Sequence, residues 1–525
     1  MRELLLAALL ISIPLALLLS AGIGLRYRSA LRRLMRQAPS PASEGDLPSA
    51  PPAPSSAPVW AAERPMAAVS LTMRERTLHG ALALTSLLVG FTAASLYLRV
   101  HAASFGGVTP LRWLFVGLML STPGVVLQAQ ILRWSLRRQL AVLLLWGLSV
   151  LAILAITNNL SSAGMDWMLI QLLVPQLLLG ALFGIPGLRA IAPYVLLPVL
   201  IVVLLALASL GLLMTLVLNA PQLIEPVVAI TGRGFVYAVA MIPALLAALL
   251  AHRLSAWISR LYRRKLFSEL SYLYGSSWLI VLVLQVLPGW NGQVPGPGPL
   301  LPLLAWLWIP LLFRCLPARL SGSASRTPPT LLVLRVFRRG GPMGWLFDHV
   351  VQRWRMVGPV LLISAADLAT RTIEPDALVA FLERRLQERY ISSDAQLIQQ
   401  LQAIDRSSDH DGRWRVSEFC CYASTWKPTL EALLQQADVV LMDLRGFTAA
   451  NNGCRHELRR IAESSSLRAA VLLSDERTDR NTAEQDLGRP GHTAAIHWVS
   501  ANQRRIQAVD SILTPLLRPF ASDVS

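Results

Sequence analysis

The chain has 525 residues, of which 54% are hydrophobic, and its mean hydropathy is +0.49. Only 15% of the residues are charged, whereas a soluble protein carries about 25%, so the composition excludes an ordinary soluble enzyme. The formal net charge is nevertheless +17. Such an excess of basic residues indicates either a nucleic-acid partner or a membrane topology, and the position of the charges distinguishes the two.

The charge excess lies in the apolar part of the chain. Residues 1–317 contain 22 basic and 8 acidic residues and carry +14, whereas residues 318–525 contain 26 basic and 23 acidic residues and carry only +3. Basic residues that flank apolar segments orient a chain in a bilayer. We therefore expect the lipid bilayer as a partner of this protein, and we expect no nucleic-acid partner.

Nine apolar segments in the N-terminal part are long enough to cross a hydrocarbon core of about 30 Å. The sixth segment is longer than a bilayer requires, and the ninth is short and bounded by proline. The predicted spans are residues 4–25, 78–98, 113–132, 139–157, 167–187, 191–218, 235–252, 271–288 and 299–313.

The connections between these segments predict one orientation. The loops that follow the first, third, fifth and seventh spans, together with Arg64, Arg74, Arg76 and Arg314, hold 18 basic residues, whereas the opposite side holds four. Because basic residues stay on the cytoplasmic side, the N-terminus is predicted outside and the C-terminal region in the cytoplasm. The expected location is the bacterial inner (plasma) membrane, which the chain would cross several times.

The composition divides the chain into four regions. The first apolar run is followed rather than preceded by its positive charges, which favours an anchor over a cleaved signal peptide. A stretch rich in Pro, Ala and Ser then predicts an extended linker. The expected regions are an N-terminal membrane anchor with a basic flank at 1–37, a cytoplasmic linker at 38–66, an eight-span membrane region at 67–318 and a cytoplasmic α/β domain at 319–525.

The span interiors contain almost no ionisable residues, although transporters usually keep such groups there. Their polar side chains include the neutral amides of Gln128, Gln171, Gln176 and Gln285, for which interhelical hydrogen bonding is the favoured interpretation. Nothing in the pattern argues for a permeation path.

From about Thr330 onward, short runs rich in Val and Leu alternate with amphipathic segments. This alternation is typical of a parallel sheet covered by helices on both faces. The predicted fold class is therefore an α-helical polytopic membrane domain followed by a soluble α/β domain. The predicted strands are 330–337, 359–364, 414–421, 438–443, 468–474 and 494–499. The predicted helices are 343–356, 376–390, 394–403, 426–436, 453–464 and 501–517.

Polar residues gather directly after the fourth predicted strand. That strand ends in Asp443, a loop with Arg445 follows, and Asn452 and Gly453 lead into a helix that carries Glu457. Ligands of such folds bind beyond the carboxyl ends of the strands. Free N–H groups at the helix start and Arg445 suit a phosphate, and Glu457 suits sugar hydroxyls or acid–base chemistry. We therefore predict a ligand site formed by these residues.

The same residues also fit a purely structural role. Asn452 is a good N-cap, and Cys454 and Glu457 have the spacing of a capping box if the helix starts late. Asp443 and Arg445 can also pair with each other. From the residues alone, capping and ligand binding remain alternative interpretations.

Two related α/β families have motifs that resemble the stretch Gly453-Cys454-Arg455-His456-Glu457-Leu458. It is similar to the Trp-Cys-x-x-Glu-Leu stretch of Toll/interleukin-1 receptor (TIR) domains, whose Glu cleaves NAD. It is also similar to the Gly-x-x-x-Glu stretch of nucleoside 2-deoxyribosyltransferase-like proteins, whose Glu is the nucleophile. The resemblance, which covers about 414–475, implies a flavodoxin- or TIR-like fold and an NAD or nucleoside glycohydrolase-like activity. It also implies NAD or another nucleotide as ligand or substrate and Glu457 as the catalytic residue.

The chain departs from both families in three ways. Gly453 stands where TIR domains have Trp, the first predicted strand is followed by Arg338-Arg339-Gly340-Gly341, and no Asp/Tyr pair typical of the deoxyribosyltransferases is apparent. The chain as a whole resembles bacterial multi-span membrane proteins with a C-terminal cytoplasmic α/β domain.

No metal site is expected. The run Asp409-His410-Asp411 consists of consecutive residues, which rarely converge on one ion, so a solvated loop is the favoured interpretation. Cys454 lies at a predicted helix start, where a thiol can be activated, and is a minor alternative nucleophile.

The main hypothesis is an inner-membrane protein whose cytoplasmic domain binds or cleaves a nucleotide, as a signalling sensor or effector, without a certain cofactor. In the first alternative, the domain is a non-enzymatic protein-interaction module, since a fold does not fix a function. In the second, the chain is a transporter with a regulatory cytoplasmic domain. Assembly into a homo-oligomer is compatible with each hypothesis.

Overall fold

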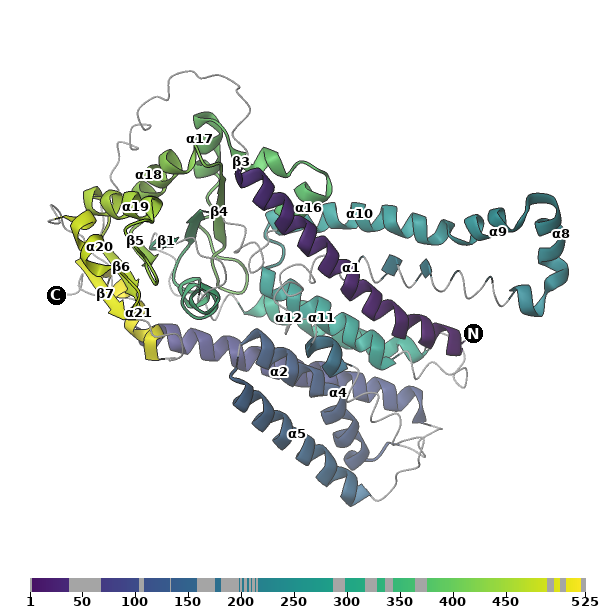
Figure 1. Cartoon of the computed structure of the whole chain (residues 1–525). Coiled ribbons are helices and arrows are strands. Elements are labelled where there is room, and N and C mark those ends of the chain that lie inside the picture. The colour runs from purple at the N-terminus through teal and green to yellow at the C-terminus, as the bar shows by residue number, and fades with distance from the viewer. Residues whose placement is uncertain are drawn as a thin grey trace. The chain divides into compact units, whose positions relative to one another are not determined.

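The structure of the protein is a computed structural model (Figure 1). It describes residues 2–36, 68–102, 108–132, 134–157, 175–180, 216–286, 298–316, 328–335, 343–363, 375–488, 495–500 and 507–520, and a few single positions between 198 and 213. The chain folds into two compact units. The first unit comprises Met1–Tyr27, Leu78–Leu316 and Thr370–Val379, and the second comprises Arg28–Thr77, Pro317–Ala369 and Ala380–Ser525.

The N-terminal part of the chain is helical. Its described helices are α1 (Arg2–Arg36), α2 (Ala68–Val100), α4 (Pro110–Ile131), α5 (Leu136–Thr157), α8 (Pro221–Thr231), α9 (Arg233–Ala240), α10 (Ile242–Arg263), α11 (Glu269–Val286), η2 (Gly298–Leu307) and α12 (Trp308–Cys315).

Four helical segments among the described residues are long and apolar enough to cross a membrane. They are Met73–Val100, Pro110–Ile131, Arg137–Ile156 and Gly298–Cys315, and they coincide with the spans predicted at 78–98, 113–132, 139–157 and 299–313. This number is smaller than the nine spans predicted from the sequence. Two further predicted spans, 167–187 and 191–218, lie for the most part outside the described residues.

The span predicted at 235–252 is not one helix. The chain forms α9, breaks at Met241 and continues as α10, which has a proline in its first turn. Proline has no N–H for the preceding turn, so it favours a new helix start at this point. Arg253, Arg260 and Arg263, which the sequence placed in a loop, belong to α10.

Glycines allow helices of the first unit to approach closely. A methyl group on Gly124 of α4 would overlap the Ser86 side chain of α2 and lie 2.8 Å from the Trp278 ring of α11. A methyl group on Gly90 would lie 2.7 Å from the backbone nitrogen of Ser121. Such small residues are typical of interfaces between membrane helices, because they bring the backbones together.

Neutral polar side chains in this interface find partners on neighbouring helices. The Tyr274 hydroxyl donates to the Leu82 carbonyl at 2.9 Å, and the Gln128 amide donates to the His79 carbonyl at 2.9 Å. The amide of Gln285 donates to a carbonyl of α4 at 3.5 Å. The interhelical hydrogen bonding predicted for Gln128 and Gln285 is therefore confirmed.

The other two glutamines do not support that prediction. Gln171 lies outside the described residues. Neither amide atom of Gln176 has a hydrogen-bond partner within the described part of the chain, although both atoms are buried.

The C-terminal domain contains a parallel sheet of seven strands in the order β3-β4-β2-β1-β5-β6-β7. All six predicted strands are confirmed, and the two-residue β3 was missed because so short a strand has no periodicity. The strands are β1 (Leu331–Arg335), β2 (Val360–Ile363), β3 (Tyr390–Ile391), β4 (Val416–Cys421), β5 (Val439–Asp443), β6 (Ala469–Ser474) and β7 (Ala495–Ser500).

The helices between the strands lie close to the predicted positions, except that α20 was missed. They are α14 (Met343–Leu346), the π-helix η3 (Phe347–Val351), α15 (Gln352–Trp354), α16 (Pro375–Leu382), η4 (Leu386–Arg389), α17 (Asp394–Gln402), α18 (Trp426–Gln436), α19 (Asn452–Glu463), α20 (Arg480–Leu487), α21 (Gln507–Leu517) and η5 (Arg518–Phe520).

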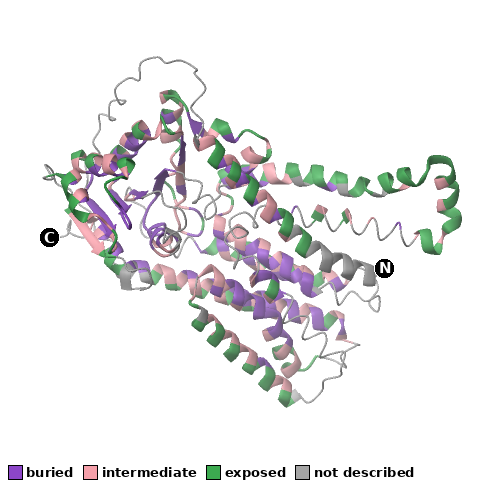
Figure 2. Cartoon of the chain, in the orientation of Figure 1, coloured by how far each residue is buried: buried purple, intermediate pink, exposed green. Residues whose placement is uncertain are grey.

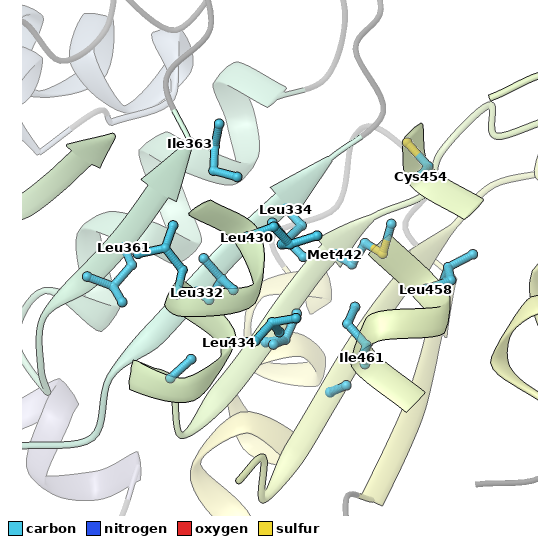
Figure 3. Packing of buried hydrophobic residues seen from close by; sticks show 14 of the residues in the cluster. Leu332, Leu334, Leu361, Ile363, Leu430, Leu434, Met442, Cys454, Leu458 and Ile461 are labelled. Carbon is cyan, nitrogen blue, oxygen red and sulfur yellow. The ribbon is translucent and has the colours of Figure 1, made fainter. Parts of the chain in front are cut away.

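The central strands are buried on both faces, since alternate side chains of a strand point to opposite faces and the residues of β1, β2 and β5 are all buried. Leu332 of β1 and Met442 of β5 belong to a cluster with Leu430 of α18 and with Leu458 and Ile461 of α19, as Figure 3 shows. Strands β1 and β5 are buried along their whole length, and Figure 2 colours the central strands as buried. The long Val- and Leu-rich runs in the sequence are explained by this double burial.

The strand order reverses direction beside β1. The chain runs from β1 to β2 on one side and later enters β5 on the other side, so the switch point lies between β1 and β5. In open α/β sheets, ligands bind at the carboxyl ends of the strands at this point. The last residues of the two strands, Arg335 and Asp443, are register partners there.

Candidate functional site

Two charged side chains end the two strands at the switch point. Arg335 of β1 and Asp443 of β5 are only 5% and 6% exposed. Buried charges are costly unless they have partners, so such residues mark a structural ion pair or a functional site. Arg335 was not among the predicted site residues, although a single arginine inside the apolar run Leu331-Leu332-Val333-Leu334 was a visible signal.

The Asp443 carboxylate is held by Arg445. The Arg445 Nε and Nη2 atoms donate to its two oxygens at 2.7 Å each, and the Arg445 backbone N–H donates to it at 3.2 Å. This bidentate geometry is the strong form of an Arg–carboxylate pair. The sequence prediction placed these two residues together correctly. In the structure, both oxygens of Asp443 accept hydrogen bonds from Arg445. The Arg445 Nη1 atom is buried and has no hydrogen-bond partner among the described residues.

The loop that follows β6 supports the loop that follows β5. The backbone N–H of Gly446, whose φ is +70°, donates to the Asp475 carboxylate at 2.8 Å. The same carboxylate accepts bonds from the Thr478 hydroxyl and the Arg477 backbone N–H. Burial alone would raise the pKa of Asp475, but these hydrogen bonds outweigh it and lower the pKa. Asp475 therefore fixes the loop as a carboxylate.

Sequence reasoning missed this support. The signal was the Asp475-x-x-Thr478 spacing after a strand, which is typical of a side-chain-stabilised turn.

The start of α19 differs from the predicted cap. The helix begins at Asn452, so Asn451 occupies the N-cap position, and its side chain accepts from the backbone and hydroxyl of Thr448 at 2.8 and 3.1 Å instead of capping the helix. The prediction of Asn452 as N-cap is therefore wrong by one residue. Asn452 and Gly453 are exposed, and the ring of Trp426 lies near Gly453.

Glu457 lies on the buried face of α19. It shares this face with Cys454, Leu458 and Ile461, at helical spacing, and is only 3% exposed. A capping box requires the Glu at the third helical position, whereas Glu457 is the sixth residue of α19. Its Oε2 atom has no hydrogen-bond partner in the described part of the chain. The capping interpretation of Glu457 is therefore wrong.

The environment of Glu457 favours the neutral acid. Burial raises the pKa of its carboxyl to about 8, although the nearby positive charge of Arg335 opposes the shift. At neutral pH the group therefore holds a proton and can donate a hydrogen bond to a ligand.

Cys454 is not an activated thiol. It is buried, and its Sγ–H donates to the Arg335 carbonyl at 3.8 Å. Burial and the neighbouring Glu457 raise the pKa of the thiol, and the charge of Arg335 only partly offsets them. The minor alternative of a Cys454 nucleophile is therefore disfavoured, because the thiolate is the reactive form.

His456 points toward α18 rather than toward this site. Its ring lies 5.5 Å from the Trp426 ring in an edge-to-face arrangement. Burial is the largest cause that lowers the pKa of His456, followed by the charge of Arg460. The histidine is therefore neutral at pH 7.

Other predicted features lie elsewhere. The Arg338–Gly341 stretch falls outside the described residues. The loop with Asp409 and Asp411 is not solvated as predicted, because both side chains are buried and pair with arginines, Asp409 with Arg415 at 2.9 Å and Asp411 with Arg413 at 2.8 Å. Within the described residues, no group of three or more His, Cys, Asp or Glu side chains could hold a metal.

Comparison of the chain with protein-family models, with curated proteins and with solved structures gives no match. The resemblance to TIR and deoxyribosyltransferase-like domains therefore remains an expectation from the motif around Glu457. The function has to be argued from the site itself.

The arrangement combines a protonated buried acid with cationic groups at the switch point. Arg335 is the last residue of β1, and Arg445 follows the end of the neighbouring strand β5 by two residues. The exposed first turn of α19 comes next in the chain. Arginine and helix N-termini favour anions, and a neutral carboxyl can donate to a hydroxyl or carbonyl oxygen. Such a combination suits a ligand with both a phosphate and a sugar.

Proposed function

We propose that the protein is an integral membrane protein of the bacterial inner membrane with nine spans, its N-terminus outside and its α/β domain in the cytoplasm. The four apolar helical segments support membrane integration, and the distribution of 18 basic residues on one side against four on the other supports the orientation.

We further propose that the cytoplasmic domain binds a nucleotide, NAD or a related nucleoside phosphate, at the carboxyl ends of β1 and β5. The observation that carries this proposal is Glu457, a buried carboxyl group whose Oε2 has no partner among the described residues, beside the switch point. Buried polar atoms without partners are rare in folded proteins and concentrate at functional sites.

Each predicted site residue has a role in this proposal. Arg445, through its buried Nη1, and the first turn of α19 at Asn452 and Gly453 bind phosphate. Asp443 acts indirectly, because it holds Arg445 in place. Glu457 binds the ribose, and in an enzymatic version it stabilises the anomeric carbon once it has lost its proton.

The test uses the full chain purified in detergent. Calorimetric titration with NAD, adenosine monophosphate and adenosine should show tightest binding for ligands that carry a phosphate, and release of nicotinamide from NAD reports cleavage. Glu457→Ala, which removes the carboxyl group, should weaken binding at least tenfold and abolish any cleavage. The matched control is Glu463→Ala at the exposed end of the same helix. No binding by the wild-type protein, or equal binding by the two variants, would refute the proposal.

A second candidate function is a protein-interaction module without catalysis. It is favoured by the closed Asp443–Arg445 pair, in which the Asp443 carboxylate serves a structural ion pair. Under this function, Glu457→Ala would change the melting temperature of the domain but leave nucleotide titrations flat for both the variant and the wild type. The same two measurements therefore distinguish the candidates.

A further inference from the structure

The basic residues of α10 form a stripe along one side of the helix. Arg253, Trp257, Arg260 and Arg264, the C-cap residue, follow one another at intervals of four, three and four positions. Residues at such intervals lie one above another on a helix. All four side chains are exposed, and Trp257 keeps 50% of its surface in contact with the surroundings. We call these four residues the α10 stripe.

The opposite side of the same helix segment is buried. Ile258, Ser259 and Tyr262 are 7%, 3% and 8% exposed. Helical geometry at about 100° per residue puts them across the helix axis from the α10 stripe. The stripe therefore lies on the exposed side of α10, and Figure 2 shows α10 coloured largely as exposed.

The charges of the α10 stripe are not neutralised within the described structure. The sequence of α10 contains no Asp or Glu. Arg253, Arg260 and Arg264 form no ion pair with any residue that the structure describes. A partner that binds this surface through its arginines is therefore negatively charged.

The N-terminal half of α10 indicates which kind of negatively charged partner binds the stripe. Leu245, Leu246, Leu249 and Leu250 are 63%, 54%, 58% and 65% exposed. An exposed apolar half, then an exposed tryptophan among arginines, is the pattern of a helix at the boundary between hydrocarbon and headgroups. A free phosphate in solution would use only the arginines and would leave the leucines in water.

We infer that the α10 stripe binds the phosphate headgroups of anionic phospholipids in the cytoplasmic leaflet. The arginines donate to the phosphate oxygens, Trp257 lies at headgroup level, and the leucines contact the acyl chains. This inference rests on the proposed membrane integration and goes beyond it, because an orientation rule requires basic residues on one side but not on one helix face.

The experiment measures lipid selectivity of the full chain in neutral detergent. Brominated phosphatidylglycerol and brominated phosphatidylcholine are titrated separately, and the quenching of Trp257 is isolated by subtracting the Trp257→Phe signal. The triple variant Arg253→Gln, Arg260→Gln, Arg264→Gln is compared with Arg477→Gln, Arg480→Gln, Arg518→Gln, which removes the same charge from exposed positions of the α/β domain.

Phosphatidylglycerol should quench Trp257 at far lower concentration than phosphatidylcholine in the wild type and in the domain variant. The stripe variant should need about 100-fold more phosphatidylglycerol, since each basic residue near an anionic surface contributes about a factor of five. A stripe variant with lysine at the three positions should retain most of the selectivity. Equal quenching by both lipids in the wild type, or unchanged selectivity in the glutamine variant, would overturn the inference.

Resistance of membranes to alkaline extraction separates this result from the membrane proposal. If the wild-type chain is extracted, the membrane proposal fails. If it resists extraction but shows no selectivity for phosphatidylglycerol, only the lipid inference fails.

Discussion

The helical part and the sheet domain bury polar side chains in different ways. In the helical part, buried polar groups such as Ser86, Tyr274 and Gln285 are neutral, and they bond to side chains or carbonyls of neighbouring helices. In the sheet domain, the buried groups include charges, and Asp443 is neutralised by Arg445 two residues away. Neutral amides and hydroxyls suit the apolar environment of the helical part, because burying a charge there costs too much free energy.

Glu457 stands apart from both patterns. It is a carboxyl group in the apolar face of α19, where every other buried residue is a hydrophobe or a thiol, and its Oε2 lacks a partner among the described residues. The buried carboxylates of Asp409, Asp411 and Asp443 are paired with arginines, whereas one oxygen of Glu457 has no partner among the described residues. This exception is the observation on which we base the proposed role of Glu457 in ligand binding.

The largest effect is expected from breaking the buried pair of the sheet domain. Asp443→Ala leaves the Arg445 guanidinium buried without its carboxylate, so the free energy of unfolding of the domain should fall by about 3–5 kcal/mol. Chemical denaturation of the full chain, followed by hydrogen exchange at β5, measures this loss. The control Glu484→Ala removes the exposed Arg480–Glu484 pair and should cost less than about 1 kcal/mol. Equal costs for the two variants would contradict burial of the pair.

The next effect tests close packing in the helical part. Gly124→Val places atoms where Ser86 and Trp278 already lie, so stability of the detergent-solubilised protein should fall by about 1–3 kcal/mol. Gly80→Val is the matched control, because nothing lies within 4 Å of a methyl group there. Thermal unfolding of both variants in the same detergent compares them. Similar melting temperatures would mean that α2, α4 and α11 do not pack as described.

The next prediction concerns the pH dependence that Glu457 introduces, which is spread over several pH units. Its carboxyl has a pKa of about 8 in the folded domain against 4.5 as the reference value, so the folded state holds the proton more tightly than the unfolded chain. The contribution of this proton to the free energy of unfolding is complete below pH 4.5 and is lost as the pH rises to about 8. The free energy of unfolding falls by at most about 1.4 kcal/mol per pH unit in this range.

Melting temperatures between pH 6 and about 9 measure this dependence. Glu457→Gln, which cannot lose a proton, should flatten the decline, whereas Glu463→Gln should leave it unchanged. An identical decline in wild type and Glu457→Gln would show that another group is responsible.

The smallest effect comes from a neutral hydrogen bond. Tyr274→Phe removes the hydroxyl that contacts Ser86 and the Leu82 carbonyl, so it should cost about 0.5–1.5 kcal/mol. Tyr237→Phe serves as control, because Tyr237 is 57% exposed. A cost above that of Asp443→Ala would reverse the comparison between the two regions.

The sequence was sufficient where the signal is local. The Val- and Leu-rich runs predicted all six long strands of the sheet, and four of the predicted spans coincide with membrane-length helices. It failed at the break before α10, where Pro243 starts a new helix, and at the buried Asp409 and Asp411, which pair with arginines only six and two residues further along the chain.

The candidate site shows the same division. The position of Asp443 at a strand end and its pairing with Arg445 follow from spacing along the chain, and both were predicted as local features. Arg335 was missed because it is separated from Asp443 by more than 100 residues of sequence and becomes its neighbour only through strand order.

Hydropathy and periodicity are properties of neighbouring residues, so the sequence was enough to predict an apolar helical part followed by a parallel α/β domain. The state of Glu457, in contrast, depends on the folded structure. Whether a glutamate caps a helix or lies buried depends on where the helix starts and on what covers its face, and here β1 and β5 cover it. Burial by residues far away in the chain therefore made Glu457 a neutral acid rather than a cap.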